Sequence, residues 1–162
     1  MALFKVDGPV GRAMQKMATS PAFRKVGPKV VPPMDRALHK LTGGRVIMSR
    51  ALVPSLVLTT TGRKSGLPRD SPLACVPDGG GGWWVVGSNF GKPAHPAWTG
   101  NLIADPATAV SFEGRSYPSV ARLLSDDEKA EVWPTLTAAW PAYDDYVKSS
   151  GRNIRVFHLT PT

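Results

Sequence analysis

The chain has few of the residues that build covalent or metal-based frameworks. Its 162 residues include one cysteine, Cys75, and three histidines. A single cysteine excludes an internal disulfide framework and fits a reducing compartment, and no second ligand stands at suitable spacing to make a zinc site with His95. No stretch approaches the roughly 18 apolar residues of a membrane span, and no signal-peptide pattern opens the chain. We therefore expect a globular, cytoplasmic protein without a metal.

Acidic residues are scarce in the first third of the chain. Residues 1–50 contain ten Lys and Arg against two Asp, a net charge of +8, whereas residues 51–162 contain ten charges of each sign. A basic segment on a neutral domain indicates an anionic surface, either lipid or nucleic acid. Residues 10–18 predict a short amphipathic helix with a basic polar face, which either lies on a membrane or docks on its own domain. Because no nucleic-acid recognition motif is present, we expect no nucleic acid, and a peripheral association with the inner face of the cell membrane.

Composition divides the chain into two parts. Residues 1–40 form a basic, helical and proline-rich extension, in which four prolines predict that residues 20–33 are mostly extended. A short helix over residues 33–41 begins at a proline and stops at Gly43 and Gly44, the usual asymmetry of helix ends. Residues 41–162 form the globular domain.

The globular part alternates short β-branched runs with turn signals, and its runs should pair in antiparallel order. Ser125 and Glu128 have the spacing of a capping box at a helix start. The expected strands cover residues 52–61 after a start near 45–50, then 73–76, 83–86, 110–112, 117–124 and 154–159, with helices over 97–104 and from 125. About six strands with few helices predict an α+β, mainly antiparallel fold, a small β-barrel flanked by helices.

One connection between these strands is rich in cations and glycine. A buried strand ends at Gly62 and is followed by Arg63, Lys64, Ser65 and Gly66, with Arg69 shortly after. Glycine lets a backbone approach a ligand, and successive N–H groups together with Arg and Lys can hold a phosphate or carboxylate. The loop is not a P-loop, because threonines precede Gly62 and a strand follows it. A solvated turn is the alternative interpretation.

Several stretches in one order resemble the deazaflavin (coenzyme F420)-dependent nitroreductase family. The similarity covers roughly residues 41–161. Its landmarks are Leu41-Thr42-Gly43-Gly44-Arg45, Thr60-Thr61-Gly62-Arg63-Lys64-Ser65-Gly66 with Arg69 and Pro72-Leu73, Gly87-Ser88-Asn89, His95-Pro96 with Trp98 and Asn101-Leu102, and Pro141, Tyr143 and Tyr146 ahead of Arg152. The resemblance implies a split β-barrel of the FMN-binding type that binds coenzyme F420.

The resemblance also implies roles for individual residues toward that cofactor. Coenzyme F420 joins a flat ring to a phosphodiester and an oligoglutamate tail. The anionic part would bind to the glycine-rich loop, the ring would lie near the end of a later strand, and a short helix would close the groove. The loop residues are Gly62, Arg63, Lys64, Ser65, Gly66 and Arg69. The residues at the strand end are Gly87, Ser88 and Asn89, and the helix residues are Trp98 and Asn101. We interpret His95 as structural.

The same resemblance implies a substrate pocket that contains Ser88, Trp140, Tyr143 and Tyr146. Tyrosine offers apolar area and one O–H donor. Trp140 stands where a tyrosine is found in the best-known nitroreductase, and an indole cannot act as a general acid. The implied reaction is hydride transfer from the reduced deazaflavin to a quinone-like, nitroaromatic or activated-alkene acceptor. An aromatic core stripe is the alternative for these residues.

Two other functions remain open from the sequence. An FMN-dependent oxidoreductase of the same barrel superfamily would also bind a phosphate and a flat ring, although three cations suit a longer polyanionic tail better. A basic module that binds nucleic acid or membranes without catalysis would use residues 1–50 instead.

Overall fold

A computed structural model describes residue 16, residues 20–42 and residues 53–162. The predicted helix over residues 10–18 and the predicted strand start at residues 45–50 lie outside these residues, except for Lys16, which is helical and exposed. The strands are β1 (Ser55–Thr61), β2 (Pro68–Pro77), β3 (Trp83–Val86), β4 (Ala107–Phe112), β5 (Arg115–Leu123) and β6 (Val156–Pro161). The helices are α2 (Pro21–Thr42), η2 (Asn89–Gly91), α3 (Ala97–Ala104), α4 (Asp126–Ala139) and α5 (Ala142–Ser150).

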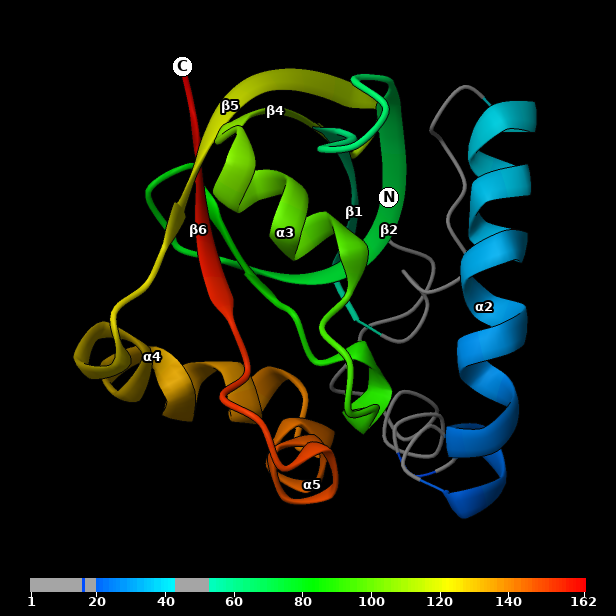
Figure 1. Cartoon of the computed structure of the whole chain (residues 1–162), viewed down its shortest axis with the longest axis vertical. Helices are drawn as coiled ribbons and strands as arrows, with labels where there is room; N and C mark the ends of the chain where they lie inside the picture. The colour runs from blue at the N-terminus through cyan, green and yellow to red at the C-terminus, as the bar shows by residue number, and fades with distance from the viewer. Residues whose placement is uncertain (1–15, 17–19, 43–52) are drawn as a thin grey trace.

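The six strands close into an antiparallel barrel in the order β1-β2-β3-β6-β5-β4 (Figure 1). Closure comes from the pairing of β1 with β4, in which Leu58 lies opposite Val110. The β4–β5 hairpin turns at Glu113 and Gly114, which have φ values of 53° and 76° and match the left-handed conformation that tight hairpins need. The predicted mainly antiparallel split barrel with flanking helices is therefore confirmed.

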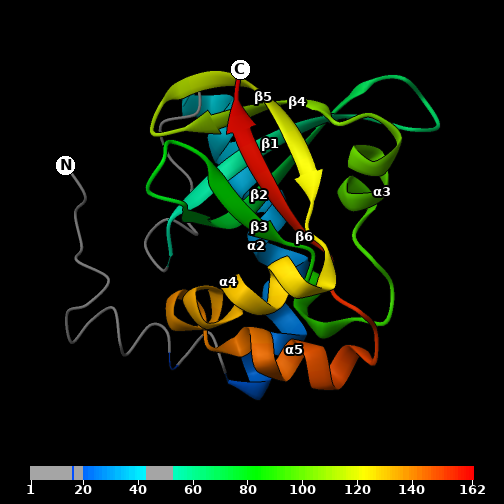
Figure 2. The ribbon, with the colours of Figure 1, turned by 90° about the vertical axis from the view of Figure 1, so that its left-hand side faces the viewer.

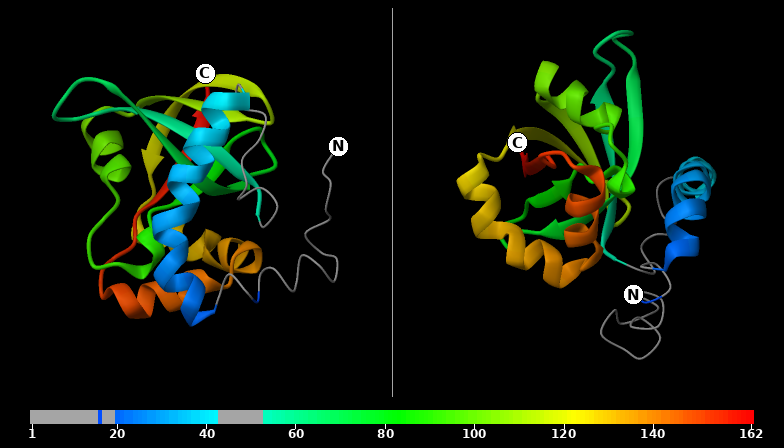
Figure 3. Two further views of the ribbon diagram at one scale, coloured as in Figure 1. Left: turned by 90° about the vertical axis from the view of Figure 1, so that its right-hand side faces the viewer. Right: turned by 60° about the horizontal axis from the view of Figure 1, so that its bottom comes forward.

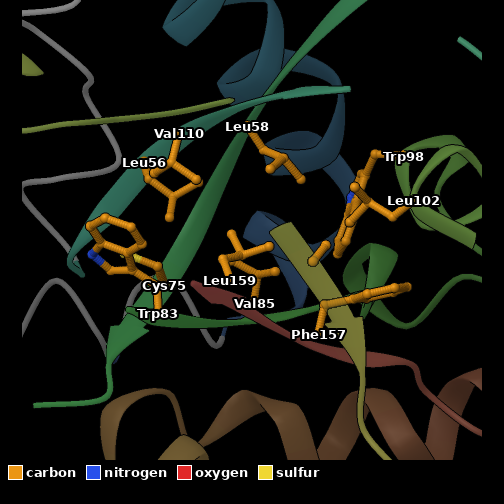
Figure 4. Close-up of a cluster of buried hydrophobic side chains, with 11 residues drawn as sticks. Leu56, Leu58, Cys75, Trp83, Val85, Trp98, Leu102, Val110, Phe157 and Leu159 are labelled. Atoms are coloured by element: carbon orange, nitrogen blue, oxygen red, sulfur yellow. The ribbon is translucent and has the colours of Figure 1, made fainter. Parts of the chain in front are cut away.

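The barrel interior is a single apolar cluster (Figure 4). It is filled from both sides of the barrel by alternate strand residues, since successive side chains of a strand point to opposite faces. Its members are Leu56, Leu58, Cys75, Trp83, Val85, Trp98, Leu102, Val110, Ala121, Phe157 and Leu159. Trp98 and Leu102 come from α3, so this helix is anchored directly in the core.

A second apolar cluster joins α4 and α5 to one end of the barrel (Figures 2 and 3). Ser125 and Glu128 form the predicted capping box at the start of α4. Helix α5 was not predicted, although Asp144 and Asp145 in its first turn and Gly151 at its C-cap, with φ 63°, are ordinary helix-end signals. The members of this cluster are Val86, Leu124, Leu136, Ala142, Tyr143, Tyr146, Ile154 and Val156.

The expectation that residues 20–33 are extended is wrong. One helix, α2, runs from Pro21 to Thr42 along the outside of the barrel (Figure 3, left), where it contacts β2 and η2. Proline has a φ compatible with helices and costs mainly a hydrogen bond and a steric contact, and packing against the barrel offsets this local cost. The helix also crosses the predicted division at residue 40.

Several strand boundaries also differ from expectation, including the starts of β1, β2, β4, β5 and β6. Strand β2 begins at Pro68 rather than at residue 73, because all seven residues of β1 find partners in it, from Ser55 opposite Ala74 to Thr61 opposite Pro68. Strand β6 begins at Val156 rather than at residue 154. The extended β2 places Arg69 in a strand and shortens the cationic loop to residues 62–67.

Two leucines of the β1–β2 hairpin test this account of the core. Leu58 is fully buried, whereas Leu67 is 58% exposed at the hairpin tip. We expect Leu58→Ala to lower the free energy of unfolding by about 2–5 kcal/mol, since it removes transfer energy and leaves a cavity. Leu67→Ala should change it by no more than about 0.5 kcal/mol. Urea unfolding of both variants checks this, and equal losses would contradict the barrel register.

Candidate active site

The turn between β1 and β2 and the first residues of β2 (residues 62–69, the cationic hairpin) form a tight loop closed by its own backbone. The amide of Gly62 donates to the Leu67 carbonyl at 2.8 Å, and that of Gly66 donates to the Gly62 carbonyl at 2.7 Å. The hydroxyl of Ser65 accepts from the Leu67 amide and from Arg69 Nη2, both at 3.3 Å. Gly66 has a φ of +67°, where glycine is favoured. Ser65 therefore organises the loop and the first residues of β2 rather than standing free.

Helix α3 positions the base of this loop. The side-chain oxygen of Asn101 accepts from the Arg63 amide at 3.1 Å, and its Nδ2 donates to Thr60 Oγ1 at 3.0 Å. Asn101 and Thr60 are both buried, so these bonds are shielded from competing water. The predicted groove residue Asn101 thus fixes where the hairpin leaves the barrel.

The guanidinium of Arg63 lies directly on Gly100. A Cβ added to Gly100 would collide with Arg63 Nη1, and Nη1 donates to the Ala97 carbonyl at 3.5 Å. A methyl group at position 100 would therefore displace the guanidinium, the far end of a flexible side chain, from this contact. Gly100 was not among the predicted site residues, although a glycine inside a predicted helix normally has a packing or functional reason.

The cations of the hairpin have no carboxylate partner among the residues that the structure describes. Arg63, Lys64 and Arg69 are exposed and form no ion pair there, and the neighbouring Asp70 accepts instead from Thr59 Oγ1 at 2.8 Å. Three cations within seven residues, none with a carboxylate partner in the described part of the chain, favour a bound anion with more than one charge.

A second group of predicted site residues follows β3. A Cβ at Gly87 would lie 2.8 Å from Thr99 Cγ2 and 3.2 Å from the Arg155 carbonyl, so this glycine lets the strand end pack on α3. Ser88 and Asn89 are half-buried, and Asn89 Nδ2 donates to the Ala94 carbonyl at 2.8 Å. Asn89 and Phe90 have φ values of 47° and 55°, which are uncommon for residues other than glycine and often mark functional loops.

The predicted aromatic pocket residues come together beneath this loop. Tyr143 and Tyr146 on α5 are only 4% and 3% exposed, and their rings meet edge to face at 6.4 Å. Phe90 of η2 packs on Tyr146 with the same geometry at 6.4 Å. Trp140 is half-buried at the C-cap of α4. Burial raises the pKa of Tyr143, with smaller contributions from Cys75 and Tyr146, so its hydroxyl stays protonated.

Trp98 is placed differently from the groove position implied by the resemblance. Its side chain is 6% exposed and packs against the Phe157 ring at 5.7 Å inside the barrel cluster. It anchors α3, whereas Thr99, Gly100 and Asn101 of the same helix contact the two predicted site segments. Helix α3 thus joins the cationic hairpin to the loop after β3.

His95 has cations around it rather than metal ligands. Arg152 Nη1 lies 3.0 Å from His95 Nδ1, which must be the acceptor because arginine can only donate. Among the described residues no group of three or more His, Cys, Asp or Glu could hold a metal ion.

None of the helices described here has the length and apolar character that crossing a bilayer requires.

Comparison with known proteins gives consistent matches. A sequence model of the F420H(2)-dependent quinone reductase family matches residues 34–161. The F420H(2)-dependent quinone reductase Rv1261c of Mycobacterium tuberculosis (strain ATCC 25618 / H37Rv) is 30% identical over 128 residues, 76% of this chain and 85% of that protein. Rv3178 of the same strain, named provisionally for the same activity, is 33% identical over 112 residues, 69% and 93% of the two chains. The solved F420-H2 dependent reductase FDR-A is 35% identical with a TM-score of 0.60, and the match covers 66% of this chain and 94% of that one.

The environment of His95 generates a pH prediction. Burial lowers the pKa of His95, and Arg155 and Arg152 lower it further. The unfolded chain, with a histidine pKa of about 6.5, therefore binds more protons than the folded one as the pH falls through that value. The free energy of unfolding should decrease between about pH 7.5 and about pH 5.5, by more in the wild type than in His95→Gln.

Urea unfolding of both proteins at the two pH values measures this difference. Glutamine keeps an oxygen that can accept from Arg152 but does not titrate, so other titrating groups affect both proteins alike. The same pH dependence in the wild type and the variant would show that His95 does not have a lowered pKa.

Proposed function

The chain belongs to the F420H(2)-dependent quinone reductase family, and we propose that its cationic hairpin binds the anionic part of coenzyme F420 while Ser88 and α5 border the electron acceptor. Membership confirms the expected F420-dependent oxidoreductase and decides against FMN as the cofactor. It specifies quinone reduction rather than nitroreduction, so reduction of nitroaromatic or activated-alkene acceptors is a proposal for this chain.

The observation that supports the assignment of the hairpin to the cofactor is the contact of the Arg63 guanidinium with Gly100. The residues present fit the cofactor, because a phosphodiester and an oligoglutamate tail need several cations and the hairpin offers Arg63, Lys64 and Arg69 without carboxylate partners in the described chain. When bound in its reduced form, coenzyme F420 supplies a hydride. Arg63 would bind the anionic end, and α3 would fix the position of that guanidinium before binding.

The acceptor side of the proposal involves Ser88 and the aromatic residues of α4 and α5. Phe90 links the loop between β3 and α3 (residues 87–96, the Ser88 loop) to Tyr146 by a ring contact, and α5 packs against η2. A protonated tyrosine in an apolar setting can donate a hydrogen bond or a proton to an acceptor oxygen. Trp140 supplies apolar area at the same end, which suits a quinone ring. Within this pocket we propose Tyr146 as the proton donor, because it is the tyrosine that contacts the Ser88 loop.

The Arg63–Gly100 contact predicts a specific pattern of cofactor affinities. Arg63→Ala should weaken binding of coenzyme F420 at least tenfold, because a charge-assisted hydrogen bond contributes about 1.5–3 kcal/mol. Gly100→Ala should also weaken it, because the new methyl group displaces the guanidinium. In the double variant Gly100→Ala should add little. Absorbance or fluorescence titration of each protein measures the dissociation constants.

Arg115→Ala is the matched control for this cycle. Arg115 is equally exposed but begins β5 beside Phe112, at the opposite end of the β4 ladder from the hairpin. It should leave the dissociation constant unchanged. Additive effects of Arg63→Ala and Gly100→Ala would mean that Gly100 contacts the cofactor by another route, and no effect of Arg63→Ala would remove the hairpin from the site.

The two tyrosines of α5 give a test of proton donation. Tyr146→Phe should lower quinone turnover by roughly 10²-fold, the scale of general acid catalysis, without changing cofactor affinity. Tyr143→Phe, which removes a hydroxyl of equal size from the same core, should have a much smaller effect. Steady-state kinetics with reduced coenzyme F420 and a soluble quinone measures both. Full turnover in both variants would show that the tyrosines only shape the pocket.

We also propose that the basic N-terminal part of the chain favours anionic membrane surfaces, where a lipid-soluble quinone is found. Helix α2 exposes Val26 and Val30 at 56% and 44%, and the adjacent Lys25 and Lys29 are exposed as well. Apolar and cationic side chains on one exposed stretch suit a lipid interface. The family match begins at residue 34, so most of this segment lies outside it.

Charge reversal tests the membrane proposal without removing α2, which contacts the barrel. The full chain should co-sediment with anionic liposomes at low salt and less at high salt, since each cation contributes about 1 kcal/mol. Lys25→Glu with Lys29→Glu should abolish most of this binding, while Arg115→Glu with Lys148→Glu should not. Equal binding of both double variants would place the contact elsewhere, and no binding by the wild type would refute the proposal.

A further inference from the structure

We propose that Arg152 is a positioning residue that holds the Ser88 loop in its reactive conformation and ties it to α5. This inference rests on the proposed acceptor pocket. In the sequence Arg152 is a landmark of the resemblance without an implied role, and the proposed cofactor and acceptor contacts do not involve it. It follows Gly151, the C-cap of the helix that contains Tyr143 and Tyr146.

One guanidinium group makes all the contacts that support this role. Arg152 Nη2 donates to the Ser88 carbonyl at 2.7 Å, Nη1 donates to the Gly87 carbonyl at 3.0 Å, and Nε donates to the Lys92 carbonyl at 3.0 Å. Nη1 also lies 3.0 Å from His95 Nδ1. Three carbonyls and a ring nitrogen of one loop thus surround a single planar cation, which a lysine ammonium could not satisfy in the same geometry.

The loop needs such support because its backbone is strained. Asn89 and Phe90 both have left-handed φ angles, a conformation that persists only where surrounding contacts impose it. On its other side the loop is pressed against α5, since a Cβ at Gly91 would collide with Ser149 Oγ and lie 3.3 Å from Tyr146 Cα. Arg152 and α5 therefore hold the loop from two directions.

These contacts point to catalysis rather than to general stability. The barrel ladder and both apolar clusters are complete without the Arg152 side chain, which forms no ion pair with a described carboxylate. What the side chain does fix is the position of Ser88 relative to the tyrosines of α5. Loss of that constraint should misplace the acceptor and the cofactor ring expected at this loop, while the cationic hairpin still binds the anionic part of the cofactor.

Arg152→Lys is the variant that separates these effects, because it keeps the charge but cannot reproduce the fork of donors. We expect the amides of Gly91 and Lys92, which donate to Ser88 and Asn89 carbonyls in the wild type, to exchange with deuterium roughly tenfold faster or more. We expect kcat/KM for a soluble quinone to fall roughly tenfold or more. The dissociation constant for coenzyme F420 should change by much less, about threefold at most, because the hairpin still binds its anionic part.

Two further measurements make the test specific. Guanidinium ion added to Arg152→Ala should restore part of the quinone turnover and slow the loop exchange, a response that a general packing defect would not give. Arg122→Lys is the matched control, because Arg122 pairs with Glu128 on the surface at 2.6 Å, and it should change neither quantity.

Unchanged loop exchange in Arg152→Lys would overturn the proposal. So would faster exchange with full quinone turnover, or a loss of turnover that only parallels a loss of cofactor affinity. Failure of the proposed function itself would be seen separately, as wild-type protein that does not bind coenzyme F420 or as Ser88→Ala with undiminished quinone turnover.

Discussion

The docking of α3 on the barrel is the contact on which both halves of the site depend. Trp98 and Leu102 insert into the barrel core, which fixes the position of the helix on the barrel. The residues between them then face outward to the functional segments, with Gly100 beneath Arg63 and Thr99 against Gly87 and Arg155. A shift of this helix would displace the cationic hairpin and the Ser88 loop together.

The charges of the site follow a consistent physical logic. Where cations are needed for structure, this protein gives them acceptors within the chain, as with Arg152 and the three loop carbonyls or Lys129 with Asp126. The cations of the hairpin lack a described carboxylate partner, although holding like charges close together costs free energy. In the proposed function the anionic part of coenzyme F420 supplies the missing negative charge. Arg152, whose acceptors lie within the chain, differs in this respect from Arg63 and Arg69.

Local sequence signals predicted the structure correctly where a single residue type determines the backbone conformation. The boundaries of α3, the capping box of Ser125 and the turn at Glu113-Gly114 were all predicted, because helix caps and left-handed turns depend on nearest neighbours. The same reasoning failed for α2, where three interior prolines argued against a helix that packing on β2 and η2 stabilises. It also placed the start of β2 too late, since only pairing with β1 reveals that Pro68 and Arg69 belong to a strand.

The sequence by itself indicated a small, mainly antiparallel barrel, a cationic and glycine-rich segment at Gly62–Arg69 and the family that the chain resembles, because these depend on residue types and their spacing. Only the tertiary structure decided that Trp98 is a core anchor, that Gly100 seats the Arg63 guanidinium and that Arg152 holds the Ser88 loop. Each of these contacts joins residues about 35 to 65 positions apart, and each depends on the register of a closed barrel. No local pattern encodes that register, since it is the outcome of burying two apolar clusters at once.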